Sequence, residues 1–95
     1  MSDISSLLPG LKVDLGIMTT AYDERLMQYL TRAETEIARE GVTIGDRTDD
    51  GELTIMYAAW LWRRRDGMEG MPRMLRYALN NRIFAEKMSG AKTDG

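Results

Sequence analysis

The spacing of apolar residues predicts a chain built from helices. From about Ala21 to Glu40, apolar residues recur every three or four positions and fall on one side of a helical wheel. That side comprises Tyr22, Leu26, Tyr29, Leu30, Ala33 and Ile37, whereas the opposite side is charged or polar. Thr20 is the predicted N-cap, with Asp23 three residues later, and Gly41 is expected to end the helix.

A second helix is predicted from about Asp50 to Arg65, and it is apolar on every side. Asp49 suits its N-cap, because Glu52 follows three residues later. One side carries Leu53, Met56, Tyr57, Trp60 and Leu61, and the other carries Ile55, Ala58, Ala59 and Trp62. A helix of this kind is buried all round. Either the N-terminal segment or a neighbouring subunit covers Trp62; we favour the subunit, so Trp62 is an expected interface residue.

The third long helix is predicted from Pro72 to about Met88, closed by Gly90. Its expected core stripe comprises Met71, Met74, Leu75, Ala78 and Ala85. Arg82 falls within that stripe and therefore needs a carboxylate partner or must extend to the solvent. A second apolar stripe, formed by Tyr77, Phe84 and Met88, exceeds what one small core can cover, so these residues are expected at a subunit or partner interface.

The remaining segments are short. Residues Leu7 to Gly16 predict a short helix, with Pro9 in its first turn and Gly16 at its end. Residues Gly41 to Thr48 predict a loop that either pairs as a short strand or packs over the core. The expected fold is therefore an all-α bundle of three main helices with a short N-terminal helix. It forms a single domain over residues 1–95, with a core at about 7–88 and a polar C-terminal tail at 89–95.

Composition argues against catalysis. The chain of 95 residues has no Cys and no His, which excludes thiol nucleophiles, zinc fingers and Ser-His-Asp triads. Serine occurs only at positions 2, 5, 6 and 89, near the ends. The acidic cluster formed by Asp46, Asp49, Asp50 and Glu52 lacks the spacing of a calcium loop, and helix capping explains it better. We therefore expect no enzyme activity, no catalytic residues, no metal and no cofactor.

Charge is divided unevenly along the chain. Residues 1–52 carry 11 acids and 5 bases, whereas residues 53–95 carry 4 acids and 8 bases. The candidate contacts with phosphate or an acidic partner are Arg63, Arg64, Arg65, Arg73, Arg76 and Lys87. Alternatively, the first three simply complement the dipole at a helix C-terminus. The longest apolar run, Leu53 to Trp62, is about half a membrane span, so no membrane association is expected.

Three segments carry a resemblance to a known family. They are Leu11 to Ile17, the acidic helix start at Tyr22 to Leu26, and the final helix at Met71 to Asn81. In this order, over about residues 7–88, the chain resembles the small head–tail connector (adaptor or head-completion) proteins of tailed bacteriophages. The resemblance implies a homo-oligomeric ring beneath the portal protein, with a tail or stopper protein below and DNA passing through. It also implies that the C-terminal helix or tail, within Arg73 to Gly95, grips the portal.

The expected location is therefore the neck of the virion, after synthesis in the host cytoplasm. Contact with the passing DNA would be non-specific. The main alternative is a small helical DNA-binding regulator or a packaging protein that resembles a terminase small subunit. Against a helix-turn-helix reader, the linker Asp66 to Met71 is longer than the usual turn. A third alternative is an intracellular interaction module.

Overall fold

The computed structural model describes residues 4–44, 48–64 and 70–94, without the side chains of residues 48, 49 and 89–94. Every regular element in this part of the chain is helical, so the all-α prediction is confirmed. A 3-10 helix, η1 (Ile4–Leu7), leads into α1 (Leu8–Leu15). Three longer helices follow: α2 (Asp23–Arg39), α3 (Thr48–Arg64) and α4 (Arg73–Asp94).

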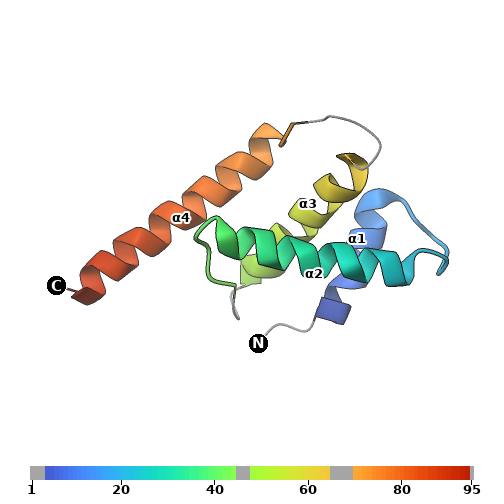
Figure 1. The fold of residues 1–95 in the computed structure, drawn as a ribbon, viewed down its shortest axis with the longest axis horizontal. Coiled ribbons are helices and arrows are strands. Elements are labelled where there is room, and N and C mark those ends of the chain that lie inside the picture. Colours follow the sequence, from blue (N-terminus) through green and yellow to red (C-terminus); the bar gives the residue numbers. More distant parts are fainter. Residues whose placement is uncertain (1–3, 45–47, 65–69, 95) are drawn as a thin grey trace.

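The helices form a body with a projecting arm. Helix α2 packs along α3 in the most extensive contact of the fold, and α1 packs against both of them. Helix α4 packs on α3 over a smaller area, and its C-terminal end extends away from the other helices (Figure 1). The molecule is consequently elongated, with principal extents of 50 × 29 × 17 Å.

Helix α2 buries the face that its periodicity predicts. Leu26, Leu30, Ala33 and Ile37 are fully buried, at spacings of three and four residues. Gly41 follows the helix with a φ of 101°, a conformation that favours glycine, and its N–H donates to the Ala38 carbonyl. Val42 is then buried and Ile44 is half-buried against the core, so this part of the predicted loop packs over the core.

The predicted start of α2 is wrong. The N-cap is Tyr22, without a side-chain cap hydrogen bond, and Thr20 contributes only its carbonyl, which accepts a hydrogen bond from the Asp23 N–H. Asp23 forms an ion pair with Lys12 of α1 at 2.8 Å instead of completing a capping box. Asp23 thus links the first turn of α2 to α1. Helix α3 begins at Thr48, so Asp49 is its second residue and the prediction of Asp49 as N-cap is wrong as well.

Helix α1 agrees with its prediction, but α4 does not end where expected. Gly16 closes α1 in the left-handed conformation, with a φ of 72°. Helix α4 continues through Gly90 to Asp94, so the predicted stop near Met88 and the non-helical tail are both wrong. A glycine within a helix costs about 1 kcal/mol relative to alanine, which weakens a helix without forcing it to end.

Candidate interaction surfaces

Among the described residues, the largest group of exposed apolar side chains lies along α4. Met74, Tyr77, Phe84 and Met88 are each more than half exposed, at 76%, 59%, 66% and 56%. At 100° per residue they fall within an arc of about 80° on one side of the helix. We call this set the α4 row. Leu75 and Leu79 are fully buried on the other side, so α4 is held to the body by the face opposite the row.

The α4 row includes the three residues assigned to the second stripe, and it corrects part of the predicted core. Tyr77, Phe84 and Met88 are exposed as that stripe requires, while their role at an interface remains a prediction. Met74 and Ala85, expected in the core, are exposed, and Leu79 takes a core position instead. The predicted buried stripe is therefore wrong in its position around α4, because this helix carries apolar residues on two sides.

Trp62 lies in the core of its own chain, so its assignment to a subunit interface is wrong. Only 9% of its surface is exposed. The rings of Tyr22 and Tyr29 pack edge-on against it, each with a centroid distance of 5.6 Å. The segment before α2 and the first half of α2 thus cover Trp62, which is the alternative that the sequence analysis did not favour.

The basic residues at the end of α3 have contacts within the chain. The Arg63 Nη2 donates to the Asp14 carbonyl at 3.2 Å, and the Arg64 guanidinium lies 4.8 Å from the centroid of the Trp60 ring. Arg65 lies outside the described residues. These contacts join α3 to α1 and cover Trp60, so Arg63 and Arg64 have a structural role.

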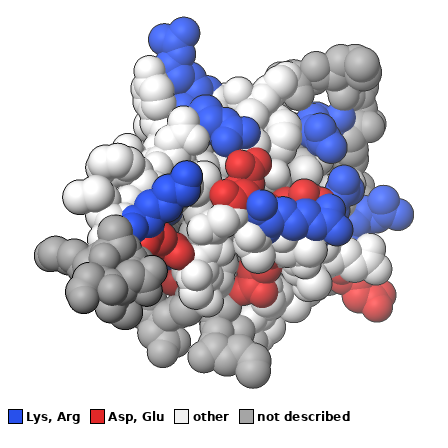
Figure 2. All heavy atoms as spheres, turned by 60° about the vertical axis from the view of Figure 1, so that its left-hand side comes forward, with Lys and Arg blue, Asp and Glu red and all other residues white. Residues whose placement is uncertain are grey.

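The basic residues of α4 differ in their contacts with the rest of the chain. Arg76 forms an ion pair with Glu40 at 3.3 Å, which fastens α4 to the end of α2. Arg73 and Lys87 are exposed on one side of the α4 row. Figure 2 shows basic side chains on this side of the molecule with acidic ones among them, rather than one continuous basic patch.

A second exposed apolar surface was not found from the sequence. It comprises Val13 near the end of α1, Met18 in the following connection and Tyr22 before α2, which are 81%, 95% and 50% exposed. We call this set the α1–α2 corner. The edge of Tyr22 packs on Trp62, so the corner lies at the C-terminal end of α3. The available signal was the position of Val13 two residues after buried Leu11, which places it on the outer side of a short helix.

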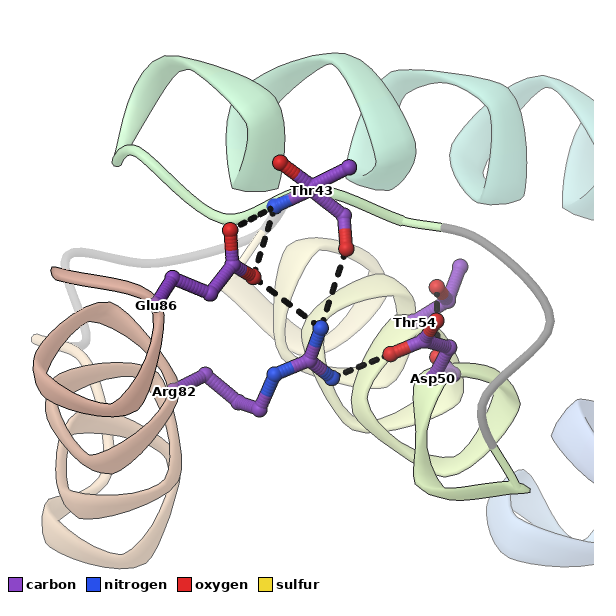
Figure 3. A network of polar contacts seen from close by, with 5 residues as sticks. All are labelled: Thr43, Asp50, Thr54, Arg82 and Glu86. Carbon is purple, nitrogen blue, oxygen red and sulfur yellow. Dashed lines mark hydrogen bonds and ion pairs between the residues drawn. The ribbon is translucent and has the colours of Figure 1, made fainter. Parts of the chain in front are cut away.

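A partly buried polar network fastens α4 to the body (Figure 3). Arg82, only 6% exposed, forms an ion pair with buried Asp50 of α3. Its Nη2 also donates to the Thr43 carbonyl at 2.9 Å and contacts the Glu86 carboxylate at 3.1 Å. The Thr43 N–H donates to both Glu86 oxygens, at 3.0 and 2.9 Å. Arg82 therefore has the carboxylate partner that its position in an apolar stripe demanded.

The same network lowers the pKa of the Glu86 carboxyl group. Burial acts to raise the pKa of Glu86, but the hydrogen bonds from Thr43 and Arg82 outweigh it, so the pKa lies below its ordinary value of 4.5. Glu86 is thus held in its ionised form. Its partners are a backbone amide and a structural arginine, and this arrangement orients α4.

A shallow groove separates α3 from α4. It has a volume of about 440 Å³ and is lined by Glu52, Leu53, Met56, Ala78, Asn81, Arg82 and Ala85. Within residues 4–44, 48–64 and 70–94, no three metal-ligating side chains cluster, and no helix is long and apolar enough to cross a membrane. The exposed apolar surfaces are therefore the strongest functional candidates in the described part of the chain.

Comparison of this chain with protein-family models, with curated proteins and with solved structures finds no match.

Proposed function

We propose that this protein is a structural subunit of a phage neck, a head–tail connector that forms a ring between the portal and the tail or stopper. The proposal starts from the resemblance of residues 7–88 to small connector proteins. The observation that carries it beyond the sequence is the α4 row, because large apolar side chains gathered on one exposed helix face are typical of a protein contact.

The shape of the molecule supports an assembly role. Helix α4 projects from the body, while the Arg82 network and the Arg76–Glu40 ion pair fix its direction. A projecting helix with a fixed direction can reach a neighbouring protein without unfolding first. In the proposed neck, the C-terminal end of α4 contacts the portal, and DNA passes through the ring with non-specific contacts only.

The test is capture by the portal protein, read by native mass spectrometry. We expect the wild-type chain to be retained in several copies per portal ring. Phe84→Asp should abolish retention because it places a charge in the α4 row, and its circular dichroism should stay that of a folded helical protein. Gln28→Asp adds the same charge on the exposed side of α2 and should be retained like the wild type.

Other outcomes would contradict the connector. A wild-type dimer that ignores the portal and binds one DNA sequence tightly would favour the regulator. If Phe84→Asp unfolded, Phe84 would belong to the core of the chain. The α4 row would then no longer support the proposal. Retention of Phe84→Asp at the wild-type level would show that the α4 row has no part in assembly.

A further inference from the structure

Two exposed arginines of α2, Arg25 and Arg32, line one small hollow on the surface of that helix. The hollow has a volume of about 200 Å³, and Gln28 and Tyr29 form the rest of its lining. The four side chains are spaced by three and four residues, so they lie on one side of the helix. Seven residues separate the arginines, which places their Cα atoms about 10.5 Å apart along the helix axis. We call this set the α2 hollow.

Both arginines can bind a ligand without breaking a contact of the fold. Within the described part of the chain, the side chains of Arg25 and Arg32 form no hydrogen bond or ion pair. Glu36, one turn after Arg32, forms an ion pair with Arg39 at 3.3 Å. Glu24 lies about 100° around the helix from Arg25. The positive charge of the α2 hollow is therefore not compensated by these two glutamates.

The packing of α2 holds the hollow in place. Tyr29 is half-buried, and its ring packs edge-on against Trp62 at a centroid distance of 5.6 Å. Leu26 and Leu30, on the inner side of the same turns, are fully buried. A site on a helix fixed in this way loses little backbone freedom when a ligand binds.

The chemistry of the hollow suits phosphate. A guanidinium group donates two parallel hydrogen bonds to phosphate oxygens, and arginine is favoured in nucleic-acid recognition for this reason. Helix α2 exposes no large apolar side chain between Asp23 and Arg39, although protein contacts are centred on such side chains. Interfaces with DNA are instead polar and positively charged. The surface of α2 at the hollow therefore favours a nucleic-acid backbone over a protein partner.

From these observations we propose that the α2 hollow binds a backbone phosphate of duplex DNA, with Arg25 and Arg32 contacting its oxygens. The inference rests on the proposed connector function, in which DNA passes through the ring, and names the surface that the DNA touches. Contacts to phosphate position DNA without reading its sequence, as a passing duplex requires. Arg63 and Arg64, which the sequence suggested for this role, have contacts within the chain.

The salt dependence of DNA binding tests the proposal. Binding of a duplex to the full chain is measured by fluorescence anisotropy over a series of salt concentrations. Arg25→Gln/Arg32→Gln should lower the affinity by roughly tenfold at low salt and reduce the slope of log affinity against log salt by about 1 to 2. Arg73→Gln/Lys87→Gln removes the same charge from exposed positions of α4 and should keep the wild-type slope.

Equal losses in the two double variants would show that binding follows net charge, and no binding by the wild type at low salt would show that no DNA site exists. Either result would overturn the proposal. Because all four substituted side chains are exposed, the circular dichroism of both variants should stay that of the wild type.

Cross-linking tests the position of the contact, since the sequence contains no cysteine. Gln28→Cys, labelled with a photoreactive group, should cross-link to the duplex from within the hollow. Asn80→Cys is the matched control, because Asn80 is exposed on α4 midway between Arg73 and Lys87 and should cross-link much less. Equal cross-linking from positions 28 and 80 would overturn the proposal.

Capture by the portal in the absence of DNA separates this inference from the connector function. The first half of α2 and the C-terminal end of α4 lie far apart in Figure 1, so Arg25→Gln/Arg32→Gln should be retained by the portal. Retention together with wild-type DNA binding would overturn the phosphate site and leave the connector in place. Loss of DNA binding in this variant, with no retention of the wild type, would support the site and contradict the connector. Loss of retention with wild-type DNA binding would show that the arginines meet an acidic protein surface instead.

Discussion

Arg82 and Asp50 are the residues on which the attachment of α4 most depends. Both are almost completely buried, and they form an ion pair between α4 and α3. Removal of one member of a buried pair leaves the other charge without its main compensation, whereas replacement of both by apolar residues of similar size is often neutral. The pair therefore favours one orientation of α4 without necessarily adding to the free energy of unfolding.

Asp50→Ala is expected to lower the free energy of unfolding by about 3 kcal/mol, because the guanidinium of Arg82 stays buried and loses its ion pair with Asp50, while its contact with Glu86 remains. Urea denaturation followed by circular dichroism measures the change. The double variant Asp50→Leu/Arg82→Met should recover most of the loss. A change below about 1 kcal/mol in the single variant would contradict this account.

The hydrogen bonds of Glu86 predict a dependence of stability on pH. The pKa of Glu86 in the folded chain is lower than the ordinary value of 4.5, so its ionised form favours folding. This contribution is complete above pH 4.5 and is lost as the pH falls through the folded pKa. Glu86→Gln should therefore reduce stability by roughly 1 kcal/mol at pH 7 and by much less at pH 3. An equal loss at both pH values would show that the charge of Glu86 does not matter.

At the scale of elements, α3 explains why an all-round apolar helix needs no neighbouring subunit. Helix α2 covers one side, α1 and the segment before α2 cover another, and α4 packs on part of the rest. Three partners arranged around one helix can bury an aromatic residue such as Trp62 within a chain of this length. Exposure is instead concentrated on α4, which has only one side against the body.

Truncation of an aromatic residue should change the free energy of unfolding much more on α3 than on α4. Trp62→Ala should lower the free energy of unfolding by about 3–5 kcal/mol, because it opens a cavity beneath Tyr22 and Tyr29. Phe84→Ala should change it by no more than about 0.5 kcal/mol, because Phe84 is 66% exposed. Thermal unfolding of both variants as monomers provides the comparison. If Trp62→Ala stayed as stable as the wild type but lost assembly, Trp62 would belong to an interface after all.

At the scale of the whole molecule, the charge pattern predicts weak contact with nucleic acid. The net charge is −2, and the face in Figure 2 mixes acidic with basic side chains. The isolated chain should therefore bind duplex DNA weakly, without sequence preference and with strong dependence on salt. Fluorescence anisotropy with two unrelated duplexes measures this. Tight binding to one of them at physiological salt would contradict the connector and favour a regulator.

The sequence by itself determined the buried face of α2, the ends of α1 and α2, and the outer stripe of α4. The spacing of Leu26, Leu30, Ala33 and Ile37 was enough to orient α2, because an amphipathic helix has one face to bury. Glycine predicted the ends of α1 and α2, since the left-handed backbone at Gly16 and Gly41 favours a residue without a side chain. Tyr77, Phe84 and Met88 were correctly separated from the core by their angular position.

Only the tertiary structure decided which of several apolar faces are covered. Trp62 and Met74 both lie on helices with apolar residues on more than one side, and local periodicity does not say which side meets a partner. Tyr22 and Tyr29 pack over Trp62 and bury it, whereas Met74 is exposed because α4 packs on the body through the opposite face, with Leu75 and Leu79. The partners of Arg82 lie far from it in the sequence, so they emerged only when the helices were placed in space.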